Sequence, residues 1–260
     1  MRAYVLHGID DLRLEETALS EIKEREVLVK VMAAGICGSD IPRIYKTGTY
    51  SYPLIPGHEF SGTVIETGLK ADKKWMGKRV GIFPLIPCGE CEPCRKKQYE
   101  MCRHYSYLGS RTNGGFAEYV AVPEENLIEL PEEVSYEVAA MLEPMAVAVH
   151  AMRKSGVMKE NTVVVYGLGT IGLLLCMFLL DAGVRDIYVI GNKEFQKRMA
   201  DLLGISETHY CDCRTREVSK WLQEQTGGRG VDVFFECVGK NETIADAIGN
   251  TAPGGTVQMV

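Results

Sequence analysis

The strongest chemical signal in the sequence is a group of four cysteines inside a fifteen-residue window. Their spacing is Cys-x-x-Cys-x-x-Cys-x7-Cys, and four thiolates this close can surround one Zn²⁺ tetrahedrally without leaving an open position. We therefore predict a structural zinc site, with an iron–sulfur cluster as the alternative, because four cysteines also satisfy such a cluster. The residues are Cys88, Cys91, Cys94 and Cys102.

Other residue types that bind metals are scattered over three segments. Cys37 lies in Gly-Ile-Cys-Gly-Ser-Asp, His58 and Glu59 lie in Gly-His-Glu-Phe-Ser-Gly, and Glu143 lies in Leu-Glu-Pro-Met. Each is a weak signal alone, since a histidine beside a glutamate is more often a hydrogen-bonded surface pair than a metal ligand. Composition and periodicity do not bring these segments together.

Residues 167–172 read Gly-Leu-Gly-Thr-Ile-Gly, which is a dinucleotide-binding pattern. The pattern follows a predicted strand at 163–166 and precedes a predicted helix at 173–182, which is the context that gives it meaning. The glycines permit the tight turn, and the helix N-terminus faces the pyrophosphate. The residues expected to contact the cofactor here are Gly167, Gly169, Thr170, Ile171 and Gly172.

The tip of the next predicted strand bears on the choice of cofactor. Enzymes that use NAD usually carry an acidic residue there, which binds the ribose 2′-hydroxyl. Here Ile190 is followed by Gly191, Asn192 and Lys193, so the repulsion of a 2′-phosphate is absent and Lys193 supplies a positive charge. We predict that NADP is preferred over NAD; the alternative is a solvated loop that tolerates both cofactors.

The elements that must position these residues change in character near residue 152. Several short β-prone runs in the first half predict a small barrel or sandwich. From residue 161 onward strands alternate with helices, which predicts a parallel, doubly wound sheet. We expect a β-rich domain over 1–152, with the cysteine lobe at about 84–105, and a dinucleotide-binding domain over 153–260. The β-prone runs are 26–32, 62–65, 77–83 and 115–122.

The composition excludes several classes of protein. Of the 260 residues, 46% are apolar and 25% are charged, as in ordinary globular proteins. The formal charge of −6 argues against a nucleic-acid partner, and no apolar run is long enough to span a membrane. With no secretory signal and an odd count of nine cysteines, we expect a reducing, cytoplasmic location.

Taken together, the motifs resemble the zinc-dependent medium-chain dehydrogenases along the whole chain. The resemblance depends on the order and spacing of residues 35–40, residues 57–62 with Gly68, the cysteine lobe and residues 167–172. It implies a GroES-like catalytic domain followed by a Rossmann domain. Within the family the chain is similar to the sorbitol dehydrogenase-like branch that oxidises galactitol 1-phosphate. This similarity is carried by Cys-Gly-Ser-Asp-Ile-Pro-Arg-Ile at 37–44, Gly-His-Glu-Phe-Ser-Gly at 57–62, Pro-Leu-Ile-Pro-Cys at 84–88, Leu-Gly-Ser-Arg at 108–111 and Gly-Gly-Phe-Ala-Glu-Tyr at 114–119.

The resemblance implies two zinc ions per chain, one catalytic and one structural. Cys37, His58 and Glu143 match the ligands of the catalytic zinc, and Glu59 matches the acid that enters or borders its coordination shell. Such a site keeps one position open for a substrate oxygen, as Lewis-acid chemistry requires.

Proton transfer is expected to involve Ser39, which matches the hydroxyl that takes the proton of the alcohol. Asp40 matches an acid behind the metal ligands. Many relatives place a histidine three residues after this serine, whereas this chain has Pro42. The proton exit is therefore assigned to solvent or to Glu59.

Arg43 is the residue that points to a phosphorylated substrate. Sorbitol dehydrogenases have an aromatic residue at this position, and an arginine can bind phosphate with two parallel charge-assisted hydrogen bonds. We predict hydride transfer from a secondary alcohol of a polyol phosphate to NAD(P)⁺, which yields a ketose phosphate. The alternatives are that Arg43 pairs with a nearby acid, that the substrate is a free polyol, threonine or butanediol, or that the chain is an inactive zinc- and nucleotide-binding fragment.

Members of the family are longer than this chain, which ends at Val260 inside the fifth predicted strand of the nucleotide sheet. We expect a C-terminally truncated chain with an uncovered apolar sheet edge and poor solubility. For a full-length chain the resemblance implies a homodimer or a homotetramer.

Overall fold

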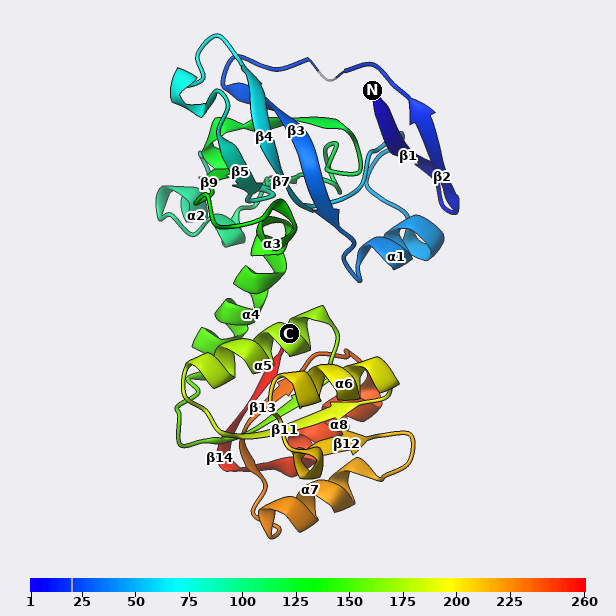
Figure 1. The fold of residues 1–260 in the computed structure, drawn as a ribbon, viewed down its shortest axis with the longest axis vertical. Helices are drawn as coiled ribbons and strands as arrows, with labels where there is room; N and C mark the ends of the chain where they lie inside the picture. The colour runs from blue at the N-terminus through cyan, green and yellow to red at the C-terminus, as the bar shows by residue number, and fades with distance from the viewer. Residues whose placement is uncertain (20) are drawn as a thin grey trace. The chain divides into compact units, whose positions relative to one another are not determined.

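The computed structural model describes residues 1–19 and 21–260, and these residues form two compact units, Met1–Glu143 and Pro144–Val260 (Figure 1). The first unit is built on an antiparallel sheet and the second on a parallel sheet. This architecture confirms the predicted fold class, a β-rich domain followed by a doubly wound sheet. Within the described part of the chain, no helix has the length and apolarity needed to cross a membrane.

The main sheet of the first unit has the order β8–β3–β4–β5–β9. Buried side chains from neighbouring strands, such as Val29, Phe60 and Val80, form its hydrophobic core. Each of the β-prone runs predicted from the sequence overlaps one of these strands. Their bounds are β3 (Glu26–Gly35), β4 (Glu59–Thr67), β5 (Arg79–Ile82), β8 (Tyr119–Pro123) and β9 (Leu127–Glu129).

The register between β3 and β4 positions the candidate metal ligands. The antiparallel pairing ends where Gly35 faces Glu59. Residues 36–40, which leave β3, and residues 57–58, which enter β4, therefore lie at the same edge of the sheet. A shift of one residue would turn every side chain of a strand to the other face, so this register decides whether the ligands can meet.

The cysteine lobe is closed at its base by a short strand pair. Strand β6 enters the lobe and β7 leaves it, with Leu85 opposite Tyr107. The remaining elements of this unit are smaller. Together with the pair they are β1 (Arg2–Gly8), β2 (Asp11–Glu16), α1 (Asp40–Pro42), η1 (Arg43–Thr47), η2 (Lys73–Trp75), β6 (Leu85–Ile86), α2 (Glu92–Arg95), η3 (Tyr99–Met101), β7 (Ser106–Tyr107), η4 (Glu124–Asn126) and α3 (Tyr136–Ala140).

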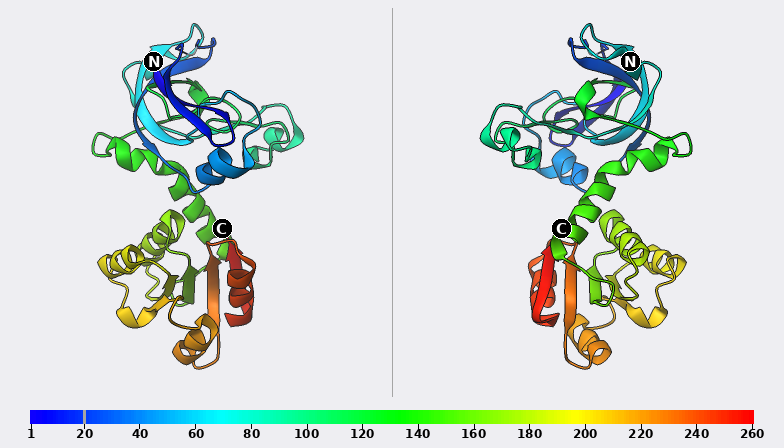
Figure 2. Two further views of the ribbon diagram at one scale, coloured as in Figure 1. Left: turned by 90° about the vertical axis from the view of Figure 1, so that its right-hand side faces the viewer. Right: turned by 90° about the vertical axis from the view of Figure 1, so that its left-hand side faces the viewer.

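The second unit contains a parallel sheet in the order β12–β11–β10–β13–β14. Figure 2 shows α5 and α6 on one face of this sheet and α8 on the other. Because both faces are covered, the central strand β10 is apolar and buried along its length. The elements are β10 (Thr162–Tyr166), α5 (Thr170–Asp181), β11 (Asp186–Gly191), α6 (Glu194–Leu202), η5 (Glu207–His209), β12 (Tyr210–Asp212), α7 (Val218–Thr226), β13 (Val231–Glu236), α8 (Asn241–Asn250) and β14 (Thr251–Met259).

The helical segment between the two sheets is divided into α3 and α4 (Leu142–Ser155). Pro144 explains the division, because it has no N–H to donate to the carbonyl of Ala140 and suits only the first turn of a helix. The break places Glu143 in the first turn of α4.

Candidate metal and cofactor sites

The sulfur atoms of the cysteine lobe lie at distances that fit one tetrahedral metal ion. Cys91 Sγ is 3.4 Å from Cys94 Sγ and 3.8 Å from Cys102 Sγ, and Cys88 Sγ is 3.9 Å from Cys94 Sγ. A tetrahedron with zinc–sulfur bonds of about 2.3 Å has sulfur atoms about 3.8 Å apart. An iron–sulfur cluster needs wider spacing, because several iron and sulfide ions must fit between the thiolates. The geometry therefore favours a single ion.

Backbone donors around the lobe favour the thiolate form that a metal binds. The N–H of Cys88 donates to Cys102 Sγ at 3.3 Å and lowers the pKa of that thiol. The N–H of Arg103 lowers the pKa of Cys91 to about 6. Burial instead raises the pKa of Cys94 to about 12, so a bound cation is what would make a thiolate of Cys94 at neutral pH.

A second group of potential ligands forms where β3 and β4 meet. Ligand atoms of Cys37, His58 and Glu59 all lie within 4.8 Å of one another. A side chain at position 35 would collide with Glu59, because a Cβ there would be 2.5 Å from Oε2. Gly35 thus leaves the space in which the carboxylate approaches the other two ligands.

The turn after β3 holds Cys37 through its neighbours. The Ser39 hydroxyl donates to Cys37 Sγ at 3.3 Å, and the Cys37 N–H donates to Asp40 Oδ2 at 3.0 Å. Asp40 is completely buried, whereas Ser39 is exposed. The hydroxyl predicted to transfer the proton therefore lies beside the metal group and reaches solvent.

Asp40 is shared between His58 and Arg43. Arg43 Nη1 donates to Asp40 Oδ1 at 2.7 Å, and His58 Nδ1 lies 3.5 Å from the same oxygen. Burial lowers the pKa of His58, but Asp40 and Cys37 outweigh this effect and raise it to about 10. The metal-free imidazole is thus protonated at neutral pH, and metal binding must displace its proton. Arg43 therefore pairs with a nearby acid, Asp40, as the alternative to phosphate binding predicted.

Glu143 lies close to this group, outside the set formed by Cys37, His58 and Glu59. Its Oε1 accepts a hydrogen bond of 3.1 Å from the Tyr107 hydroxyl. Burial raises the pKa of Glu59, His58 lowers it and the Glu143 carboxylate raises it. The two carboxylates therefore repel each other when no cation lies between them. Tyr107 was not predicted as a site residue, since no local motif marks it.

The glycine loop has the close contacts that require glycine. A Cβ on Gly172 would lie 2.1 Å from the Gly167 carbonyl oxygen, and Gly167 has a positive φ of 101°. Helix α5 starts at Thr170, directly after Gly169, with Ile171 in its first turn. In the strand order, β10 lies between β11 and β13, and the reversal between β10 and β13 is where such sheets bind nucleotides.

Gly191, Asn192 and Lys193 lie at the carboxyl end of β11, at the same end of the parallel sheet as the glycine loop after β10. Gly191 ends the strand, and the N–H groups of Asn192 and Lys193 donate to Gln196 Oε1 at 2.8 and 3.0 Å. A cavity of about 230 Å³ beside this tip is lined by basic and by acidic side chains, and one of the basic residues, Arg214, pairs with Asp212 at 2.6 Å. The basic residues are Lys193, Lys197, Arg214 and Arg216, and the acidic residues are Glu194, Glu207 and Asp212.

Comparisons with known proteins agree with both halves of this description. Residues 23–132 match the family model of the alcohol dehydrogenase GroES-like domain, and residues 170–260 match that of the zinc-binding dehydrogenases. Galactitol 1-phosphate 5-dehydrogenase of Escherichia coli (strain K12) is 33% identical over 251 residues, which are 96% of this chain and 72% of that protein. The chain belongs to the zinc-dependent medium-chain dehydrogenase family.

Further members of this dehydrogenase family are similar over nearly the whole chain. Sorbitol dehydrogenase of Bacillus subtilis (strain 168) is 30% identical over 266 residues, and the match covers 100% of this chain and 74% of that protein. The crystal structure of the Escherichia coli galactitol-1-phosphate dehydrogenase superposes with a TM-score of 0.92 at 31% identity, over 100% of this chain and 75% of that one. A zinc-binding dehydrogenase of Sinorhizobium meliloti bound to NADP gives a TM-score of 0.91 at 30% identity, over 98% and 75%.

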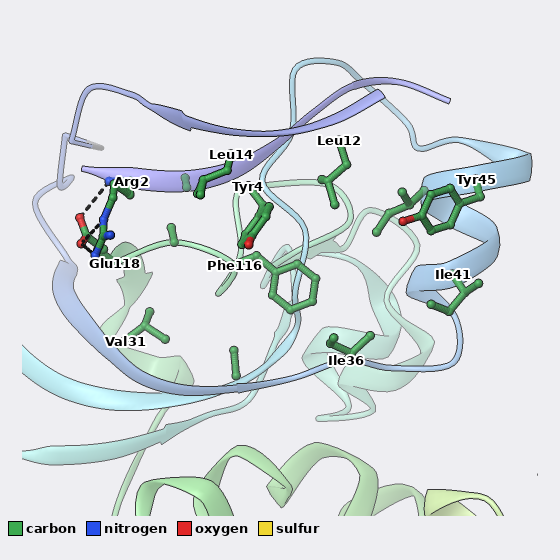
Figure 3. A pocket seen from close by; sticks show the side chains of 14 residues that line it. Arg2, Tyr4, Leu12, Leu14, Val31, Ile36, Ile41, Tyr45, Phe116 and Glu118 are labelled. Atoms are coloured by element: carbon green, nitrogen blue, oxygen red, sulfur yellow. Dashed lines mark hydrogen bonds and ion pairs between the residues drawn. The ribbon is translucent and has the colours of Figure 1, made fainter. Parts of the chain in front are cut away.

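The dehydrogenase also has an apolar cavity of about 660 Å³, which is lined by none of the candidate metal ligands (Figure 3). It lies between the β1–β2 hairpin, β3 and α1, and Figure 3 shows Phe116 in the middle of its side chains. Arg2 and Glu118 form an ion pair of 2.9 Å at its edge. The walls are mainly aliphatic and aromatic.

Proposed function

We propose that this protein is a zinc-dependent oxidoreductase that transfers a hydride from a secondary alcohol of a polyol phosphate to NADP⁺. The observation that carries the proposal is the approach of Cys37, His58 and Glu59 to within 4.8 Å, with the Ser39 hydroxyl beside them. The carbinol C–H bond breaks, its electron pair moves with the hydrogen to the nicotinamide, and the hydroxyl proton leaves. The product is a ketose phosphate.

Two metal sites with different roles support this chemistry. Cys37, His58 and Glu143 would hold the catalytic zinc, with Glu59 able to enter or leave the shell. When bound, zinc supplies Lewis-acid polarisation of the alcohol oxygen. The lobe would hold a second, structural zinc through Cys88, Cys91, Cys94 and Cys102. A homodimeric or homotetrameric assembly stays a prediction from the resemblance.

The chain's own groups orient the substrate and move the proton. Ser39 accepts the alcohol proton. Because this chain has Pro42 where many relatives have a histidine, the proton needs another exit, and the exposure of Ser39 supports direct transfer to solvent. Glu59 is the other acceptor, because burial already raises the pKa of its carboxyl. Arg43 keeps the donors of its guanidinium that do not contact Asp40, and these would bind the substrate phosphate.

A direct assay tests the proposal. Purified protein is supplied with galactitol 1-phosphate or free galactitol, each with NADP or NAD, and formation of the reduced nicotinamide is followed by its absorbance. Activity with the phosphate ester and NADP supports the whole proposal. Activity with galactitol alone would keep the zinc chemistry and reject the phosphate. No turnover by a chain that retains both metals would favour a binding fragment without catalysis.

Replacing Arg43 by alanine is expected to weaken binding of the phosphorylated substrate selectively. A hydrogen bond to a charged group contributes roughly 1.5–3 kcal/mol, so KM for the polyol phosphate should rise at least about tenfold. KM for the free polyol should change little. Asp40→Asn is the control, because it disturbs the same ion pair without removing the guanidinium. Equal effects on both substrates in both variants would show that Arg43 acts through Asp40.

Replacing Lys193 by alanine is expected to reduce the preference for NADP. The side chain lines the cavity at the tip of β11, where loss of one charged donor should raise KM for NADP by about tenfold and leave KM for NAD unchanged. Lys197→Ala is the matched control, because Lys197 lines the same cavity but pairs with Asp201 and Glu207. A preference for NADP that survives in Lys193→Ala would reject this assignment.

A further inference from the structure

Tyr107 contacts two of the residues assigned to the catalytic metal. Its hydroxyl donates to Glu143 Oε1 at 3.1 Å. Its ring meets the His58 imidazole edge-on, with ring centres 5.9 Å apart and planes at 64°. Strand β7 supplies this side chain, so the element that closes the cysteine lobe also reaches the second metal group.

The chemistry of the contact makes Tyr107 a donor. The hydroxyl lies 3.1 Å from Glu143 Oε1, and an ionised carboxylate can only accept, so the phenol supplies the proton of this bond. A neutral hydroxyl that donates to a carboxylate forms a charge-assisted hydrogen bond. Only one carboxylate oxygen is used in this bond, and the other remains available to a cation.

We propose that Tyr107 is a positioning residue for the catalytic metal: its hydroxyl holds Glu143 by one oxygen, and its ring holds the His58 imidazole. The inference rests on the proposed function, in which both residues are metal ligands. Ligand atoms of Glu59 meet those of Cys37 and His58, whereas Glu143 lies outside that set, and its hydrogen bond to Tyr107 fixes where its carboxylate lies beside the group. Tyr107 therefore sets the position from which Glu143 would reach a bound ion.

The test is the affinity of the site for Co²⁺ and the visible spectrum of the bound ion. The protein is first stripped of metal and given one equivalent of zinc to fill the cysteine lobe. Tyr107→Phe should then bind Co²⁺ about 10–100-fold more weakly, as expected when a partner of a metal ligand is lost. Its cobalt spectrum should also change. Tyr105→Phe is the matched control, since Tyr105 lies against Arg111.

A double-mutant cycle separates this inference from the proposed function. In a Glu143→Gln background, Tyr107→Phe should cause little further loss of Co²⁺ affinity, because both act through one bond. If Glu143→Gln weakens metal binding and Tyr107→Phe leaves affinity and spectrum unchanged, the positioning role is wrong and the ligand set stands. If Glu143→Gln also has no effect, Glu143 is not a ligand and both assignments fail.

Discussion

Replacing His58 by asparagine is expected to remove the catalytic metal and to lower kcat/KM by about a thousandfold or more. Lewis-acid stabilisation of the reacting oxygen contributes several kcal/mol, and each 1.36 kcal/mol is about a tenfold change in rate. His58 is buried and lies against Asp40, so water cannot easily replace the imidazole as a ligand. The measurement is zinc per chain by elemental analysis, together with the rate of reduced-cofactor formation.

His104→Asn is the control for this variant, because His104 is exposed and belongs to the cysteine lobe. It should keep both metals and full activity. In His58→Asn the metal content should fall by one equivalent, and the remaining ion should be that of the lobe. A variant that keeps both ions and its activity would show that Cys37, His58 and Glu59 come together for a different reason.

The parallel sheet could be predicted from local patterns because the elements that begin it, β10 and α5, are short and strongly apolar. The buried valines of β10, the glycine loop and the apolar helix α5 follow one another without a gap. Helix α8 escaped prediction because its buried face is made of the small or polar residues Thr243, Ala247 and Asn250. Such a face gives no hydrophobic periodicity, although it packs well against a sheet. The β1–β2 hairpin also escaped prediction, since no side chain of β2 is buried.

The metal group could be predicted only in part, because its geometry depends on contacts that are distant in sequence. Cys37 and His58 meet through the register of β3 against β4, which no local pattern specifies. The resemblance to the family is what predicted these two residues as candidate ligands. The pairing of Arg43 with Asp40 and the contact of Tyr107 with Glu143 depend on side-chain packing, which a motif does not encode.

Replacing Cys94 by serine is expected to release the structural metal and to destabilise the first unit. Among the described residues from 88 to 102, the buried side chains are those of Cys94 and Cys102. The lobe therefore has almost no hydrophobic core apart from its ligands. Structural zinc has an apparent binding free energy of about 10–16 kcal/mol, and its loss should lower the thermal midpoint clearly. Differential scanning calorimetry and metal analysis measure the two effects.

Cys213→Ser is the matched control, because Cys213 is half-buried after β12 and lies in the other unit. It should retain both metals and the wild-type midpoint. Treating the wild-type protein with a strong chelator should reproduce the Cys94→Ser result, since either change removes the ion that holds the lobe together. Recovery of iron and acid-labile sulfide instead of zinc would favour the cluster alternative. A Cys94→Ser protein that keeps both ions and melts like wild type would mean that the four sulfur atoms are close without binding a metal.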